Sequence, residues 1–296
     1  MRPAQWQASL LVSLATGAEH FFKTLGGAPA MLAVMSGDIH VVQDGRPGAP
    51  PLLLIQNAAA PLALWDPVVP SLAGAHRVIR ADLLGPGRSG PAGYDVPAQA
   101  RRAGAALDRL GAGRVTVVGH SSGGMVAAAL AGQRPGQVAA IVLINTGPSP
   151  DAKIPDPPLA RLLNAPLAGR LLWRLKTEAT IRNAARTAFT RPVDVPDAFI
   201  AHMQGMTYRS FTATMRGYWD YLSQRSIPDR VAALGLPVLV IFGGDDRRWR
   251  SSSAADYRAV PGARVELLPG VGHTPMVEDP QTTAKLLLDF ASAPAS

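Results

Sequence analysis

Two patterns of hydrophobic positions alternate along the chain. Short apolar runs without polar interruptions are typical of strands buried on both faces, and apolar residues at helical spacing lie between them. The expected strands are 33–35 and 39–42, which form a hairpin, and 51–55, 77–83, 114–119, 138–144, 237–242 and 264–268. The expected helices are 62–72, 96–110, 125–131, 252–260 and 281–290. This order predicts an α/β fold whose mostly parallel, doubly wound sheet is covered by helices on both sides.

The alternation stops between Asn145 and Leu236. This stretch has helical spacing over 159–175, 178–189 and 198–221, and it contains no convincing strand. We therefore expect a helical insertion, residues 147–232, after the sixth strand of a core that comprises residues 31–146 and 233–296.

The first thirty residues have their own pattern. Large or small apolar residues recur at every fourth position, at Trp6, Leu10, Leu14, Ala18 and Phe22. This spacing predicts an amphipathic helix over residues 1–30, packed on the body of a cytoplasmic protein. A cleaved export signal is the alternative, although its basic region would be thin. A helix lying on a membrane surface is a third possibility, supported by Arg2 and Lys23 alone.

Composition narrows the functional classes. The 296 residues are 47% hydrophobic and 17% charged, as in a folded globular protein, and no apolar run reaches the ~18 residues of a membrane span. We expect no stable membrane insertion. The chain has no Cys, which excludes disulfides, thiolate metal ligands and a thiol nucleophile.

The charge balance is basic, at +8. Such an excess suggests a polyanionic partner, but 25 of the 29 basic residues are Arg and they are scattered, without a nucleic-acid-binding motif. Residues 147–232 hold 12 Lys and Arg against 7 Asp and Glu, a net of +5. Most of the excess therefore lies in the insertion, and we expect no nucleic-acid partner.

The strand 114–119 leads into Gly119-His120-Ser121-Ser122-Gly123, followed by a helix. A serine on so sharp a strand-to-helix turn is strained and presents its hydroxyl above the sheet, and side chains two residues away on either side would collide. The helix N-terminus also favours negative charge at the serine. The alternative is a structural Gly/Ser turn, which the flanking strand and helix disfavour.

From about residue 33 to 291 the chain resembles the α/β-hydrolase superfamily, in particular its small serine hydrolases with a helical lid after the sixth strand. The matching stretches are 52–65, ADLLGPGRSG (81–90), VTVVGHSSGG (115–124), PVLVIFGGDDR (237–247) and PGVGHTPMVED (269–279). The resemblance implies a catalytic triad in the order Ser, Asp, His.

The triad partners of Ser121 follow the last two strands. His273 lies in a Gly-rich loop at the expected carboxyl edge of the sheet, where the superfamily places its catalytic base. Asp246 holds the position of the acid that orients this base, with Asp245 as the neighbouring alternative. The oxyanion hole is expected to use the backbone amides of Ser122 and Ala58.

The loop before Ala58 departs from the superfamily. Relatives have His-Gly there, whereas this chain has Gln56-Asn57. We favour the interpretation that Asn57 takes the left-handed backbone conformation that Gly would adopt. The alternative is an oxyanion loop reshaped for a particular substrate, with Gln56 and Asn57 in the pocket.

A second glycine motif, Gly85-Pro86-Gly87-Arg88-Ser89-Gly90, matches a dinucleotide fingerprint. Pro91, Gly93 and Pro97 prevent these glycines from opening a helix directly, and the match is not in the first βα unit. A strand-end turn is the favoured interpretation. We expect neither a cofactor nor a metal.

Large apolar residues are concentrated in the last helices of the insertion. Those expected to contact substrate are Met203, Met206, Phe211, Met215 and Trp219, with ordinary packing as the alternative. The sequence thus predicts a monomeric or homodimeric serine hydrolase that cleaves a carboxylic ester of a small, largely apolar acyl substrate through an acyl-enzyme. The alternatives are carbon–carbon bond hydrolysis, acyl transfer, and a non-hydrolytic lyase, cyclase or ligand-binding role.

Overall fold

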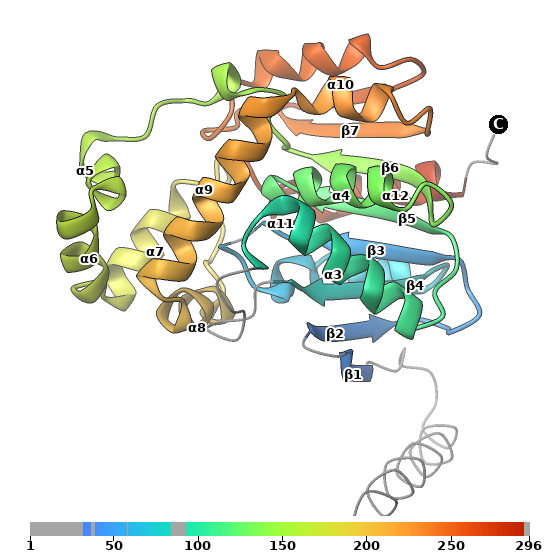
Figure 1. Cartoon of the computed structure of the whole chain (residues 1–296), viewed down its shortest axis with the longest axis horizontal. Coiled ribbons are helices and arrows are strands. Elements are labelled where there is room, and N and C mark those ends of the chain that lie inside the picture. Colours follow the sequence, from blue (N-terminus) through green and yellow to red (C-terminus); the bar gives the residue numbers. More distant parts are fainter. Residues whose placement is uncertain (1–31, 37–38, 58, 84–92, 293–296) are drawn as a thin grey trace, which may run out of the picture.

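The computed structural model of the chain describes residues 32–36, 39–57, 59–83 and 93–292 (Figure 1). Eight strands form one sheet in the order β1-β2-β4-β3-β5-β6-β7-β8; β2 is antiparallel to β1 and β4, and the remaining pairs are parallel. The strands are β1 Leu32–Ser36, β2 Ile39–Asp44, β3 Pro51–Ile55, β4 Arg77–Asp82, β5 Val115–His120, β6 Val138–Ile144, β7 Val238–Gly243 and β8 Arg264–Leu268. The predicted α/β fold is confirmed. The N-terminal helix predicted over residues 1–30 and the glycine motif at 85–90 lie outside the described residues.

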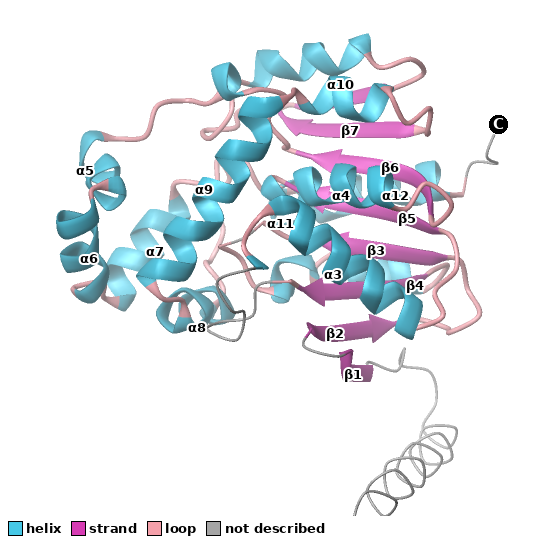
Figure 2. Cartoon of the chain, viewed as in Figure 1, coloured by secondary structure: helices cyan, strands magenta, loops and turns pink. Residues whose placement is uncertain are grey.

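Helices cover both faces of the sheet (Figure 2). On one face lie α3 (Val96–Arg109), α4 (Ser122–Gln133), α10 (Ile227–Ala232) and the 3-10 helix η5 (Ser251–Ala259). On the other lie η1 (Leu62–Trp65), α2 (Val69–Ala73), α11 (Pro275–Glu278) and α12 (Pro280–Ala291).

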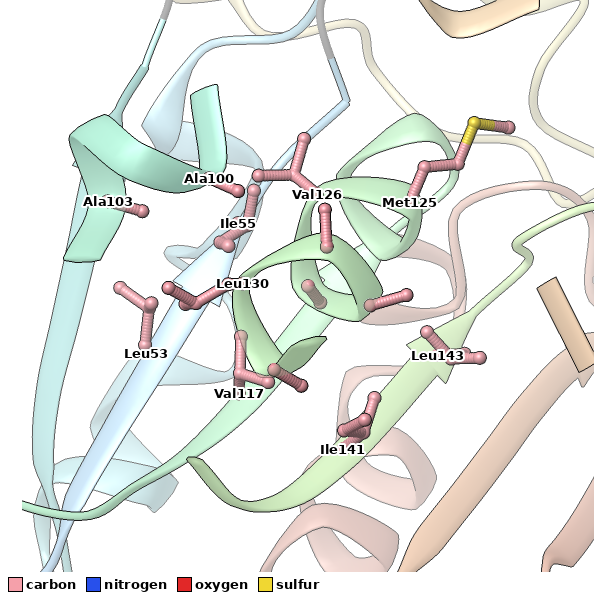
Figure 3. Close-up of a cluster of buried hydrophobic side chains, with 14 of the residues drawn as sticks. Leu53, Ile55, Ala100, Ala103, Val117, Met125, Val126, Leu130, Ile141 and Leu143 are labelled. Carbon is pink, nitrogen blue, oxygen red and sulfur yellow. The ribbon is translucent and has the colours of Figure 1, made fainter. Parts of the chain in front are cut away.

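Successive residues of the central strands supply the two cores. Leu53 and Val117 pack towards α3 and α4, together with Val126 and Leu130 (Figure 3). Their chain neighbours, Leu52 and Val118 among them, pack on the opposite face against Trp65, Leu72 and Leu287. Because side chains alternate across a strand, a strand buried on both faces must be apolar at every position, which explains the continuous apolar runs of the sequence.

Two helices predicted in the core, residues 31–146 and 233–296, differ from the structure. The helix expected over 62–72 is divided into η1 and α2, because Pro67 and Pro70 interrupt the backbone hydrogen bonds of a continuous helix. The segment 252–260 is a 3-10 helix rather than an α-helix.

Between β6 and β7 the described chain forms helices and no named strand. They are η3 (Pro150–Ala152), α5 (Pro158–Arg161), η4 (Leu162–Asn164), α6 (Pro166–Arg174), α7 (Glu178–Arg186), α8 (Asp197–Gly205), α9 (Tyr208–Gln224) and α10. The long helices expected over 159–175 and 198–221 are each broken. In the second case Thr207 caps α9 by accepting a hydrogen bond from the Ser210 amide, which starts a new helix after α8. None of the described helices is long and apolar enough to span a bilayer.

A buried ion pair joins the antiparallel strand β2 to the parallel part of the sheet. The guanidinium of Arg80 in β4 donates to Asp44 at the end of β2 (2.8 and 3.1 Å) and to Asp66 after η1 (2.5 Å). The side chains of Arg80 and Asp44 are only 5% and 8% exposed. Removing Arg80 would therefore leave a buried carboxylate without its counter-charge.

We expect Arg80→Met to lower the free energy of unfolding by about 3 kcal/mol, because removing one partner of a buried ion pair leaves the other charge buried without compensation. Arg264→Met is the matched control: its pair with Glu266 is about half exposed, and its loss should cost less than about 1 kcal/mol. Urea unfolding of the three proteins measures both effects, and equal destabilisation by the two substitutions would contradict the prediction.

Candidate active site

Ser121 occupies a strained turn between β5 and α4. Its φ of 54° and ψ of −122° lie in a region that residues with side chains rarely adopt. The chain tolerates this turn because Gly119 and Gly123 have no side chains. A Cβ on Gly119 would lie 2.5 Å from the Gly124 backbone, and one on Gly123 would lie 2.6 Å from the Gln56 carbonyl oxygen. Glycine at these two positions therefore lets the turn fold closely on itself and against the end of β3.

The structure brings Ser121, His273 and Asp246 together from three loops. His273 Nε2 is 3.0 Å from Ser121 Oγ, and His273 Nδ1 is 2.9 Å from Asp246 Oδ2. Asp245 is exposed, its amide donates to the Val271 carbonyl, and its own carbonyl accepts from Thr190 Oγ1. The neighbouring alternative for the acid is thus a surface turn residue, and Asp246 is the carboxylate that contacts the histidine.

Asp246 is a buried carboxylate with several donors. Besides His273, it accepts hydrogen bonds from Asn145 Nδ2 (2.7 Å) and from the amides of Arg248 (2.6 Å) and Trp249 (3.3 Å). Burial acts to raise the pKa of Asp246, but the charge of nearby His273 and these hydrogen bonds outweigh it and hold the pKa below its ordinary value. The carboxylate is therefore ionised at neutral pH and fixes the orientation of His273.

Asn145 is a site residue that the sequence analysis missed. It follows β6, has a φ of 45°, and is fully buried. Its side chain donates to Asp246 and to the Gly272 carbonyl (3.2 Å) and accepts from the Gly243 amide (3.2 Å). Asn145 thus joins the loops of the acid and the base. A polar residue directly after a fully apolar strand was the signal that could have identified it.

His120 is the second buried histidine of the site. Burial and the neighbouring His273 lower the pKa of His120 to about 3, so its ring is neutral at physiological pH. A neutral ring has one N–H: Nε2 donates to the His273 carbonyl (2.8 Å), and Nδ1 accepts from Asn57 Nδ2 (3.2 Å). His120 therefore links the loop of the base to the loop that contains Asn57.

The expectation that Asn57 adopts a left-handed backbone is wrong. Among the described residues other than Gly, a positive φ occurs at Ser121 and Asn145. Asn57 instead uses its side chain: Oδ1 accepts from the Ala59 amide (3.0 Å) while Nδ2 donates to His120. These two bonds shape the loop, so an amide side chain replaces the backbone freedom of a glycine.

The predicted oxyanion donors are placed only in part. Ser122 is the first residue of α4, directly after Ser121, and Ala58 lies outside the described residues. A small cavity of about 10 Å³ borders the same loop and is lined by Gln56, Asn57, Ala60, Asp82, Leu83, Gln99, His202 and Tyr218. Two of its buried oxygens, Gln56 Oε1 and Asp82 Oδ1, have no hydrogen-bond partner among the described residues.

The five apolar residues predicted to contact substrate are absent from the lining of this cavity. Met203 packs in a small cluster within the insertion, Met206 is buried, and Phe211 stacks on Trp173 at a centroid distance of 4.8 Å. Met215 and Trp219 pack against the main core. Their packing is evident, and their contact with substrate stays a prediction.

A buried carboxylate fastens the His273 loop to the insertion. Glu278 accepts hydrogen bonds from the amides of Gly272 and Thr274, on either side of His273, and from those of Thr190 and Arg191 in the insertion, at 2.8 to 3.1 Å. The His273 amide itself donates to the Ala188 carbonyl. The position of the base thus depends on the loop after α7. No group of residues suited to hold a metal ion occurs in the described part of the chain.

Comparison with known proteins agrees with this fold. The family described as alpha/beta hydrolase fold matches residues 50–280. The protein of Variovorax paradoxus named "Putative carbamate hydrolase RutD" is 31% identical over 262 residues, covering 86% of this chain and 94% of its own. That of Stutzerimonas stutzeri with the same name is 30% identical over 264 residues, covering 85% and 96%.

Solved structures share the fold. The 2-hydroxy-6-oxo-6-phenylhexa-2,4-dienoate hydrolase of Rhodococcus sp. strain RHA1 superimposes with a TM-score of 0.73 at 21% identity, covering 90% of this chain and 99% of its own. A hydrolase from Pseudomonas aeruginosa has a TM-score of 0.69 at 25% identity, covering 90% and 100%.

The low pKa of His120 predicts a pH-dependent stability. Between pH 6.5 and about 3 the unfolded chain binds a proton on this ring that the folded chain does not, so stability falls as the pH falls. We expect His120 to account for about 2 kcal/mol of the loss between pH 7 and pH 5. Denaturant unfolding at both pH values should show a smaller loss in His120→Gln than in the wild type. His40→Gln, which replaces an exposed ring, is the control. An unchanged loss in His120→Gln would refute this assignment.

Proposed function

Because the chain belongs to the α/β-hydrolase fold family and is a hydrolase, we propose that it cleaves a carboxylic ester of a small, largely apolar acyl substrate through an acyl-enzyme on Ser121. One observation carries this proposal: the His273 ring forms a hydrogen bond with the Ser121 hydroxyl through Nε2 and one with the buried Asp246 carboxylate through Nδ1. A serine hydroxyl needs such a base to act as a nucleophile at neutral pH.

In the proposed reaction His273 Nε2 removes the proton of Ser121 Oγ as the oxygen attacks the ester carbonyl carbon. The tetrahedral oxyanion is held by the amides of Ser122 and Ala58 at the N-terminus of α4 and in the loop after β3. Its collapse breaks the bond to the alcohol, which takes the proton from His273. A water then gives a proton to His273 as it attacks the acyl carbon. Collapse of this second tetrahedral intermediate breaks the bond to Ser121 Oγ, which takes the proton back from His273, and the acid is released.

The electrostatics support these proton transfers. Ionised Asp246 stabilises the imidazolium form of His273, and hydrogen bonds from Asn145 and the Arg248 amide keep the carboxylate from taking the proton itself. Neutral His120 adds no competing positive charge beside His273.

We also propose that residues 147–232 act as the lid over this site.

The triad assignment predicts how substitutions of three residues affect the hydrolysis of a p-nitrophenyl ester series. Ser121→Ala should abolish labelling by a fluorophosphonate and lower kcat about 10⁴-fold or more. Asp246→Asn should lower kcat by about 10⁴-fold, because the wrong tautomer of His273 is then favoured.

Asp245→Asn is the matched control, since Asp245 is exposed and does not contact His273, and it should keep wild-type activity. Loss of activity in Asp245→Asn with a normal Asp246→Asn would reverse the assignment of the acid. A wild-type protein that is neither labelled nor active on any ester would overturn the proposed function.

A second candidate reaction, carbamate hydrolysis, is favoured by two buried oxygens that line the small cavity beside the oxyanion loop. Gln56 is 8% exposed and its Oε1 accepts no hydrogen bond from the described residues; the same holds for Asp82 Oδ1, which lines the same cavity. Unpaired buried acceptors are costly, and a substrate N–H would satisfy one. An ester has no N–H next to its carbonyl, whereas a carbamate does. The relatives named carbamate hydrolases agree with this candidate.

Two substrates that differ only in this position separate the candidates: p-nitrophenyl propionate carries CH₂ where p-nitrophenyl N-methylcarbamate carries N–H. Gln56→Leu should slow acylation by the carbamate about tenfold relative to the propionate, the worth of one hydrogen bond. The nitrophenolate burst measures both rates. Gln133→Leu, on the surface of α4, is the control. Equal effects of Gln56→Leu on both substrates would exclude a role for Gln56 in choosing carbamates.

A further inference from the structure

An unusual apolar surface lies on the outer side of the insertion. Leu162, Leu167, Leu171 and Leu175 are 45%, 83%, 59% and 63% exposed. Apart from Leu267 on β8, these four are the exposed large apolar side chains of the described residues. We call them the leucine face. Such side chains scattered singly need no explanation, but four of the five in the described residues fall within fourteen residues of the chain.

The leucine face is not required for packing α6, the helix that carries two of its four leucines. On α6, Leu167 and Leu171 are four residues apart and share one side. Gly169 and Trp173, two residues further along in each case, lie on the opposite side and make the inward contacts. Trp173 stacks on Phe211 and donates to the Met206 carbonyl (3.0 Å), and Gly169 lies against Tyr208. α6 is thus held by one side and presents leucines on the other.

The charges around the leucine face have one sign. Residues 157–177 contain Arg161, Arg170, Arg174 and Lys176 and no acidic residue. The three arginines are exposed. Lys176 is engaged elsewhere, since it donates to the carbonyls of Met203 and Met206 and lies over the Trp173 ring. Leucines interspersed with exposed arginines complement a surface that is apolar within and anionic outside.

The position of α6 leaves this face accessible. The loop after α7 is fastened to the core through Glu278 and through Arg248, which donates to Thr187 Oγ1. In contrast, α5 and α6 lie at the end of the insertion farthest from the sheet (Figure 1). A flat partner could therefore reach the leucine face without meeting the core.

We propose that the leucine face docks on an anionic lipid surface. Partial insertion of the leucines would remove apolar area from water, and the arginines would contact lipid phosphates at the boundary. This accounts for the concentration of basic charge in the insertion. It requires no membrane-spanning helix, and it does not depend on the proposed catalytic reaction.

The test is co-sedimentation of the full-length protein with vesicles of phosphatidylcholine containing phosphatidylglycerol. We expect binding that weakens with added salt. Leu167→Ser/Leu171→Ser should lower the partition coefficient at least about tenfold, because apolar contact is lost. Arg170→Gln/Arg174→Gln should lower it about 25-fold, at about fivefold per arginine. Ser121→Ala should bind as the wild type does, which separates docking from catalysis.

The chain supplies matched controls. Leu267→Ser removes an exposed leucine from β8, and Arg101→Gln/Arg258→Gln removes two exposed arginines from the core; both should bind as the wild type does. Circular dichroism verifies that each variant is folded. Three results would overturn the proposal: no binding to anionic vesicles, equal binding to pure phosphatidylcholine, or a wild-type dimer in sedimentation that only the Leu167→Ser/Leu171→Ser variant disrupts, which would identify the face as an interface between copies.

Discussion

The close approach of three strand ends at Ser121 is the constraint on which the rest of the site depends. A Cβ on Gly119, Gly123 or Gly124 would collide with the turn itself, with the end of β3, or with Thr146 after β6. The glycines therefore let α4 start directly beneath the serine. In the same way they set the distance from Ser121 to the loop after β3 and to the residues after β6. The strain at Ser121 persists because these neighbouring strands leave the turn no other conformation.

The base is positioned by polar contacts rather than by packing. Its loop, residues 269–274, contains two Gly residues and few apolar groups, so hydrogen bonds must order it. Asn145, at the end of β6, donates hydrogen bonds to Asp246 in the acid loop and to the Gly272 carbonyl in the base loop. Glu278 accepts hydrogen bonds from four amides, two in the base loop and two in the insertion. One part of the insertion is thus a structural component of the site, whereas α5 and α6 are tied to α9 and η4 instead.

The fold and the three central residues could be predicted because each has a local signal. Doubly buried strands must be apolar throughout, and loops after parallel strands meet at one edge, which brings Ser121, Asp246 and His273 together. Glu278, which orders the loop of the base, has no such signal. Glu278 stands between Val277 and Asp279, and its hydrogen bonds with the Thr190 and Arg191 amides join positions almost ninety residues apart. The breaks in the predicted helices depend on individual residues such as Pro67 and Thr207, and the spacing of hydrophobic positions does not register the effect of a single residue.

The loop after β3 shows how a departure in sequence can preserve a site. A glycine at position 57 would shape the loop by backbone freedom alone. Asn57 instead holds the Ala59 amide and the His120 ring, and His120 holds the His273 carbonyl. The chain of bonds is directional, since a neutral His120 has one N–H to donate and one nitrogen to accept. Protonation of His120 would turn Nδ1 into a donor facing the Asn57 amide. The low pKa of His120 therefore preserves the hydrogen bonds that link the oxyanion loop to the loop of the base.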